Sequence, residues 1–242
     1  MFSRKNIAMV VAEFLGAATL VAAVYTIMAR TSFPLFSAMA AGGVVALFTL
    51  GVGRASGAHL NPAITFGLWS VRRVQTARAL VMIAAQFAGG AAAWALLKYF
   101  LGHSLTSIAG TEFEWKVFVA EAVGTGIFAF GFASAVMQRF DEAKLAAGIG
   151  LSLFIGVLVA SLASNGVLNP AVAVGIQSWS WAYAAAPFAG ALVGMNVYSM
   201  LFADASALSA SASVASSVTR SSKKSAAKAA PKRKTTATRR KK

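Results

Sequence analysis

Apolar residues run in six long stretches along this chain, separated by short polar segments. A helix that rises about 1.5 Å per residue needs about 20 residues to cross the hydrocarbon core of a bilayer. The six stretches reach this length and predict membrane-spanning helices over residues 7–29, 35–53, 78–100, 116–137, 145–163 and 181–202. Two shorter apolar stretches, 61–70 and 169–178, follow glycine-containing, turn-prone segments. They predict half-helices on re-entrant loops, in an all-α membrane protein.

The whole pattern occurs twice. The tripeptide Asn-Pro-Ala returns after 108 residues, at Asn61-Pro62-Ala63 and at Asn169-Pro170-Ala171. Glu13, in the first span, returns at the same offset as Glu121 in the fourth. The copies cover about 7–100 and 116–202, and each holds three spans and one half-helix. Because three is odd, we expect the second copy to be inverted, so that residues 1–202 form one membrane domain of two inverted repeats.

Composition supports the membrane assignment and narrows the chemistry. The chain is 58% hydrophobic and 12% charged, with a mean hydropathy of +0.69, whereas a soluble domain is about a quarter charged. It has no cysteine, which excludes disulfides and Cys-ligated metals. Two histidines and seven acidic residues leave little material for a metal site or an acid–base pair. We therefore expect no metal, no cofactor and no enzymatic activity.

The basic charge divides the chain into two parts. Residues 203–242 hold 11 Lys/Arg and one acid, in a low-complexity sequence that predicts a disordered tail. Attraction of this tail to an anionic membrane surface is the favoured interpretation. A solvated tail with no specific role and binding to nucleic acid remain alternatives.

The short loops between the spans predict the orientation in the membrane. One side carries eight Lys/Arg and the other carries three, and the more basic side is expected to face the cytoplasm. This places both termini in the cytoplasm, and we expect the protein to lie in the cell membrane.

The repeated tripeptide has a physical interpretation of its own. Proline suits the first position of a helix, and asparagine just before it is a strong N-cap. The side-chain oxygen can accept a helix N–H, which leaves the amide NH₂ as a donor. Two such starts on inverted half-helices should meet near the bilayer midplane, with Asn61 and Asn169 side by side. Two positive helix ends would then point at one place, offering donors to a lone pair and repelling cations.

These features resemble the aquaporin, or major intrinsic protein, family over about residues 7–202. The resemblance rests on the two Asn-Pro-Ala motifs, the preceding Ser56-Gly57-Ala58-His59, the two span glutamates and the inverted duplication. It implies a passive channel for small uncharged solutes, assembled as a homotetramer. It also implies that Glu13 and Glu121 brace the re-entrant loops, with hydration near the membrane interface as the alternative for Glu13. His59 would order its loop and line the cytoplasmic vestibule, with a pH gate as the alternative.

One part of the expected pore departs from the family pattern. The resemblance implies a narrow constriction built from one residue in the second span, one in the fifth and two on the second re-entrant loop. By ungapped spacing to the two motifs these are Ala41, Val157, Gly166 and Val172. Nearly all family members have arginine where Val172 stands, and the glycerol-conducting branch usually has an aspartate shortly afterwards. The four residues here predict a wide, apolar constriction for water, glycerol, urea or ammonia. Selectivity would fall on the asparagine pair, or on a neighbour that moves in, such as Phe36, Phe48 or Phe154.

Two other classes of function are alternatives to a channel. The chain could be a membrane tether with a degenerate pore, whose basic tail binds anionic lipid or nucleic acid. A coupled transporter is disfavoured, because apart from His59, which is expected to order its loop, no acid or base lies near Asn61 or Asn169 in the sequence.

Overall fold

The computed structural model describes residues 3–107, 109–110 and 112–203. The expected tail lies outside these residues, apart from Ala203. The described residues form eight α-helices, and six of them are long and apolar enough to cross a membrane. In chain order the helices are α1 (Arg4–Met28), α2 (Pro34–Ser56), α3 (Pro62–Ser70), α4 (Thr76–Leu101), α5 (Trp115–Met137), α6 (Glu142–Ala160), α7 (Pro170–Gly175) and α8 (Trp181–Leu201).

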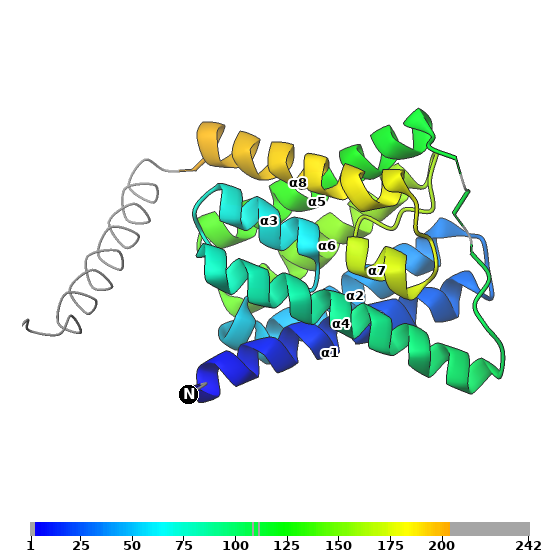
Figure 1. Ribbon diagram of the computed structural model, residues 1–242. Helices are drawn as coiled ribbons and strands as arrows, with labels where there is room; N and C mark the ends of the chain where they lie inside the picture. The colour runs from blue at the N-terminus through cyan, green and yellow to red at the C-terminus, as the bar shows by residue number, and fades with distance from the viewer. Residues whose placement is uncertain (1–2, 108, 111, 204–242) are drawn as a thin grey trace, which may run out of the picture. The chain divides into compact units, whose positions relative to one another are not determined.

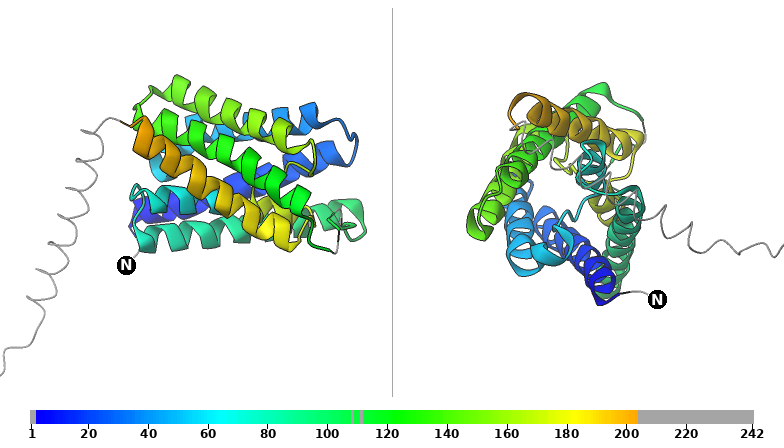
Figure 2. Two further views of the ribbon diagram at one scale, coloured as in Figure 1. Left: turned by 90° about the horizontal axis from the view of Figure 1, so that it is seen from above. Right: turned by 90° about the vertical axis from the view of Figure 1, so that its left-hand side faces the viewer.

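The helix pairings repeat as the duplication requires. In the first half α1 packs against α2 and α4, and in the second half α5 packs against α6 and α8. The half-helices α3 and α7 pack across the halves, α3 on α8 and α7 on α4. Figure 1 shows these two half-helices inside the bundle, and the end-on view of Figure 2 shows the long helices around them. The expected all-α architecture of six spans and two half-helices is confirmed.

Paired glycines set how closely the spans cross. A methyl group added at Gly89 would overlap the carbonyl oxygen of Phe14, and one added at Gly190 would overlap that of Ala122. These two sites are the α4–α1 and α8–α5 crossings, which are equivalent in the two repeats. Small residues are the usual means by which helices approach closely in lipid, where burial of apolar surface gives little drive for association.

Both half-helices end in the same way, and this makes α7 shorter than the sequence predicts. Residue Arg72 has φ +60° and Gln177 has φ +58°, the left-handed conformation that closes a helix. The next N–H then reaches back, from Arg73 to the Leu68 carbonyl at 2.8 Å and from Ser178 to the Ala173 carbonyl at 2.9 Å. Helix α7 therefore ends at Gly175 rather than near residue 178.

The start of α1 and the end of α8 lie at the same end of the bundle (Figure 1). The ends of α2 and α3 and the start of α4 lie there too. This end carries the more basic of the two sets of loops identified in the sequence. The chain is an integral membrane protein that crosses the bilayer several times.

Candidate functional site: an asparagine pair inside a narrow apolar cavity

Both half-helices begin at the asparagine of an Asn-Pro-Ala motif. The Asn61 Oδ1 accepts the N–H of Ala63 at 2.8 Å, and the Asn169 Oδ1 accepts the N–H of Ala171 at 3.0 Å. Each asparagine has extended backbone, with φ −152° and −149°, which is the usual conformation of an N-cap. Each side-chain oxygen is thereby committed to its own helix, and its amide nitrogen points elsewhere.

The two amide groups bond across the repeats. Asn61 Nδ2 donates to the carbonyl of Leu168 at 2.9 Å, and Asn169 Nδ2 donates to the carbonyl of Leu60 at 2.9 Å. The sequence predicts free donors here, and the structure differs. An NH₂ group has two hydrogens. One hydrogen of each asparagine amide is donated to the opposite loop, and the other can be donated to a molecule beside it. The asparagines thus join the two loops as well as lining the space between them.

Two buried glutamates hold the loops that lead to the asparagines. Glu13 accepts the N–H groups of His59 at 3.1 Å and of Leu60 at 2.8 Å. Glu121 accepts those of Val167 at 2.9 Å and Leu168 at 2.6 Å. Neither glutamate is exposed, so hydration at the interface does not account for Glu13.

The loop backbone is shaped to present these N–H groups. Ala58, Leu60, Gly166 and Leu168 have positive φ angles of 49°, 51°, 61° and 53°. Left-handed residues in a loop turn successive N–H groups towards one point and form a concave site for an anion. In non-glycine residues this conformation costs roughly 1–2 kcal/mol each. The carboxylate bonds offset that cost and fix the position of the residue that precedes each asparagine.

The first loop carries a further polar network. His59 Nδ1 lies 3.0 Å from the Thr65 hydroxyl oxygen, and Gln86 Nε2 donates to the same oxygen at 2.9 Å and to Glu13 at 2.6 Å. The second loop has a different set. There Asn165 donates from its backbone N–H to the Tyr183 hydroxyl at 3.0 Å. The repeats therefore share the glutamate and the asparagine but differ in the polar groups around them.

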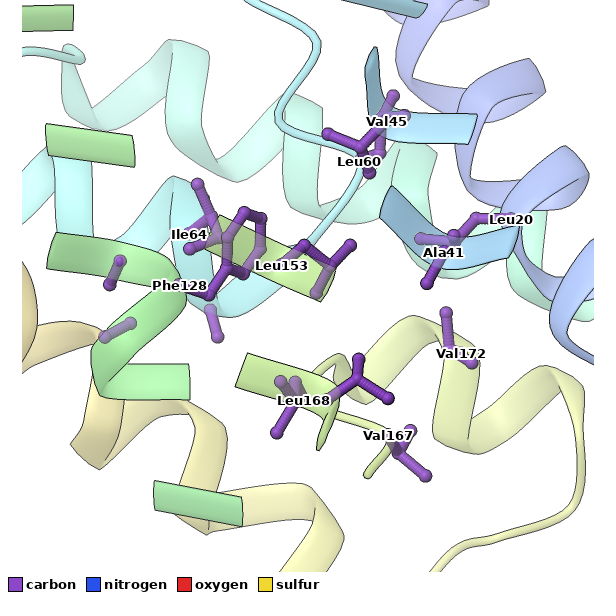
Figure 3. Packing of buried hydrophobic residues seen from close by; sticks show 14 of the residues in the cluster. Leu20, Ala41, Val45, Leu60, Ile64, Phe128, Leu153, Val167, Leu168 and Val172 are labelled. Atoms are coloured by element: carbon purple, nitrogen blue, oxygen red, sulfur yellow. The ribbon is translucent and has the colours of Figure 1, made fainter. Parts of the chain in front are cut away.

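A single cavity brings the asparagine pair and the expected constriction together. Its fifteen lining residues include Asn61 and Asn169, all four predicted constriction residues and His59. The remaining lining residues are Leu20, Val24, Ser37, Val45, Phe128, Leu153, Asn165 and Val167. Figure 3 shows Ala41 of α2 and Val172 of α7 near Leu20 of α1. Most of the lining residues are apolar.

The cavity is narrow where the sequence predicts a wide one. Its volume is about 20 Å³, and since one water needs about 10–15 Å³, it has room for only one or two water molecules. The small residues Ala41 and Gly166 do not widen it, because larger side chains, among them Leu20, Val24 and Phe128, line the same cavity. None of the three phenylalanines suggested by the sequence, Phe36, Phe48 and Phe154, lines the cavity.

Sequence reasoning missed these wall residues, although the duplication contains a signal for them. Leu20 and Phe128 are 108 residues apart, and so are Val45 and Leu153. Each pair stands at equivalent places in the two repeats and lines the same cavity. Figure 3 shows the four side chains. A residue close to the inverted-repeat axis must meet its own counterpart there. Apolar pairs at the repeat offset in α1/α5 and α2/α6 were therefore candidates for the pore wall.

The cavity continues towards the end of the bundle opposite the N-terminus. A larger space of about 370 Å³ lies there and shares Ser37 and Asn165 with the narrow cavity. Its other polar lining residues include His103, Thr106 and Ser161. The shared residues add polar groups between the wide space and the asparagine pair, so the asparagines are not the only polar groups along this path.

Comparison with known proteins agrees with this architecture. The family model described as "Major intrinsic protein" matches residues 1–202. The chain is 30% identical over 182 residues to the maize protein Aquaporin TIP1-1, covering 71% of this chain and 69% of that protein. It is 31% identical over 199 residues to a "Glycerol uptake facilitator protein-like 6" of Lactiplantibacillus plantarum, covering 75% of this chain and 92% of that protein. The chain belongs to the major intrinsic protein family.

The family assignment fixes the class of function and agrees with the fold. Members are transport proteins rather than enzymes, and this member is a channel for water and small solutes. The X-ray structure of the aquaglyceroporin from Plasmodium falciparum superposes with a TM-score of 0.69 at 20% identity, over 81% of this chain and 96% of that one. At that identity the structure supports the fold alone. The tether considered as an alternative is not favoured.

Proposed function

We propose that water and the smallest uncharged solutes, such as ammonia, cross this protein in single file past Asn61 and Asn169. The observation that supports the proposal is the narrow apolar cavity, in which each asparagine has one amide hydrogen that is not used in the bonds between the loops. A passing molecule with a lone pair can accept these hydrogens in turn. Larger solutes such as urea and glycerol require the Leu20 and Phe128 side chains to move aside, so we expect them to cross more slowly.

Ions are excluded by the same arrangement, without an arginine at Val172. A charged solute loses its hydration in a mostly apolar passage, and desolvation of an unpaired charge costs several kcal/mol or more. The N-terminal ends of α3 and α7 add partial positive charge at the asparagines. This barrier opposes cations near the middle of the pore, where the half-helices meet. We therefore expect no proton or sodium conductance above background.

A permeability series in vesicles tests the proposal. The full chain is reconstituted, and osmotic shrinkage is followed for water, urea and glycerol, with internal pH reporting ammonia entry. We expect water and ammonia to exceed protein-free vesicles clearly, with urea lower and glycerol lowest. Permeability no higher than that of protein-free vesicles for every neutral solute would contradict the proposal.

A pair of variants on α2 shows whether the flux uses this cavity. Ala41→Trp places a large side chain in the cavity and should abolish water flux. Gly43→Trp serves as the matched control, because nothing lies within 4 Å of a Cβ built at Gly43. It should conduct water as the natural protein does. Equal flux through both variants would place the pathway elsewhere.

We also propose the assembly and placement of the channel. Family members are commonly tetramers, and a homotetramer is expected here.

The excess of Lys/Arg at the end that holds the N-terminus supports a cell-membrane protein with both termini in the cytoplasm. The basic residues 203–242 would then attract anionic lipid, and nucleic-acid binding is the less favoured alternative. Deleting this segment should leave water flux unchanged and remove any binding that the tail provides.

A further inference from the structure

A basic pocket of about 490 Å³ lies at the end of the bundle that holds the N-terminus, away from the asparagine pair. Three helices form it: the start of α1, the end of α2 and the start of α4. Helix α1 packs against both α2 and α4, and these three helix ends lie at the same end of the bundle (Figure 1). Its lining residues are Arg4, Lys5, Asn6, Ala8, Arg54, Ala55 and Arg78. Four of the seven residues are cations, and none is acidic.

The pocket is short of compensating negative charge. Among the residues that the structure describes, the only one of these cations in an ion pair is Arg54, which meets Glu142 on the exposed surface. Arg78 donates from one guanidinium nitrogen to the carbonyls of Ala55 and Ser56, both at 3.3 Å. These two bonds partly offset the negative partial charge at the C-terminal end of α2, and they leave the other N–H groups of the guanidinium available to a ligand. Arg4 and Lys5 have no such bond in the described region.

Two helix starts add to the positive potential. Neither α1 nor α4 has an acidic residue in its first turn, and the N-cap of α4 makes no side-chain hydrogen bond. Carboxylates are the usual stabilising residues at this end of a helix, where the backbone dipole is positive. Here Arg4, Lys5 and Arg78 occupy the first turns instead. Repulsion among these charges is relieved when an anion with several acceptor oxygens occupies the pocket.

The neighbouring surface indicates what kind of anion fits. Ile7, Leu50 and Val81 lie three or four residues further into the same three helices and are 51, 55 and 43% exposed. Residues at this spacing share a helix face with the basic residues of the pocket. The pocket therefore lies where spanning helices leave the hydrocarbon, at the depth of lipid headgroups, with apolar surface on its inner side.

We propose that this pocket binds the phosphate of an anionic lipid headgroup, with the acyl chains along Ile7, Leu50 and Val81. Arg4, Lys5 and Arg78 contact the phosphate oxygens, and Arg54 remains tied to Glu142 at the rim. The site belongs to the folded membrane domain and is separate from any attraction exerted by the basic residues 203–242. It also lies outside the pore, so its occupancy does not require solute flux.

The test measures lipid binding to the full-length protein in neutral detergent by native mass spectrometry. Phosphatidylglycerol is the anionic probe, with phosphatidylcholine and inorganic phosphate as comparisons. The pocket variant is Arg4→Gln with Lys5→Gln. The matched control is Arg72→Gln with Arg139→Gln, which removes two exposed cations outside the pocket on the same side of the protein. All proteins keep residues 203–242, so the contribution of that segment is the same in each.

We expect the pocket variant to bind phosphatidylglycerol on the order of 10- to 30-fold more weakly, from about fivefold per charge removed. The control variant should change by less than about threefold. Phosphatidylcholine should bind more weakly than phosphatidylglycerol, and millimolar inorganic phosphate should not displace the lipid. Equal losses in the two variants would overturn the proposal, as would displacement by inorganic phosphate or equal binding of the two lipids. Unchanged water flux in both variants verifies that each is folded.

Discussion

Replacing Glu121 by glutamine tests whether the carboxylate sets the position of the second asparagine. Glu121 is fully buried and accepts three bonds, from the Ser164 hydroxyl at 2.8 Å and from the N–H groups of Val167 at 2.9 Å and Leu168 at 2.6 Å. Glutamine has the same shape but only one acceptor oxygen. Whichever way its amide turns, one backbone N–H faces an NH₂ group and loses its acceptor.

The cost follows from the kind of bond that is lost. A hydrogen bond to a charged group contributes about 1.5–3 kcal/mol, and an unsatisfied buried N–H costs a further 1–3 kcal/mol or so. Removing a buried charge returns part of its desolvation energy, so we expect a net loss of about 2–4 kcal/mol. For a chain of this size that lowers the melting temperature by roughly 5–15 °C. Since Asn169 follows Leu168 directly, water flux should fall as well.

Thermal unfolding in detergent and stopped-flow water flux in vesicles measure the two effects. Glu142→Gln is the matched control, because Glu142 pairs with Arg54 at the surface, where its side chain is 58% exposed. An exposed ion pair contributes about 0–1 kcal/mol, so this variant should melt within a few degrees of the natural protein and conduct normally. If Glu121→Gln also melted within about 2 °C of the natural protein and kept full water flux, the Glu121 carboxylate would not brace the second loop.

Three further predictions concern the pore wall and the helix crossings. Phe128→Ala should enlarge the cavity and raise glycerol flux severalfold in the vesicle assay, whereas Phe36→Ala, outside the cavity, should not. Val172→Arg should reduce urea and glycerol flux more than water flux, because it adds bulk and donors to a cavity that already limits size; equal reduction of all solutes would contradict this. Gly190→Ala should destabilise the protein by about 1–3 kcal/mol in thermal unfolding, because the methyl group meets the α5 backbone. Gly43→Ala, which meets nothing within 4 Å, should be neutral or slightly stabilising.

The spans and half-helices could be predicted because their causes are local. Length and hydropathy identify a spanning helix, and Asn-Pro identifies the start of each half-helix. The observed spans Arg4–Met28 and Trp115–Met137 begin within three residues of the predicted 7–29 and 116–137. The end of α7 was missed because a left-handed glutamine, Gln177, closes it. Glutamine has no strong preference for that conformation, so composition gave no warning.

The residues around the pore were harder to predict than the motifs. Spacing from the two motifs identified Ala41, Val157, Gly166 and Val172, and all four line the cavity. Its width was misjudged because the small residues Ala41 and Gly166 say nothing about the size of the side chains opposite them. Those walls depend on which faces of α1 and α5 turn inward. That is a property of the packed bundle, and in a chain apolar on every face it leaves little trace in local hydrophobic periodicity.

The two bonds between the loops bear on how the protein is made. Asn61 is 107 residues ahead of Leu168, and Leu60 is 109 residues ahead of Asn169. At about 5–20 residues per second, ribosomal synthesis separates these partners by roughly 5–20 seconds. For that interval the first loop has an amide and a carbonyl whose eventual partners do not yet exist, at a depth where lipid supplies none. The nascent first half must therefore keep its loop in water or beside the insertion machinery until α7 arrives, and the channel is completed only when the two halves close on each other.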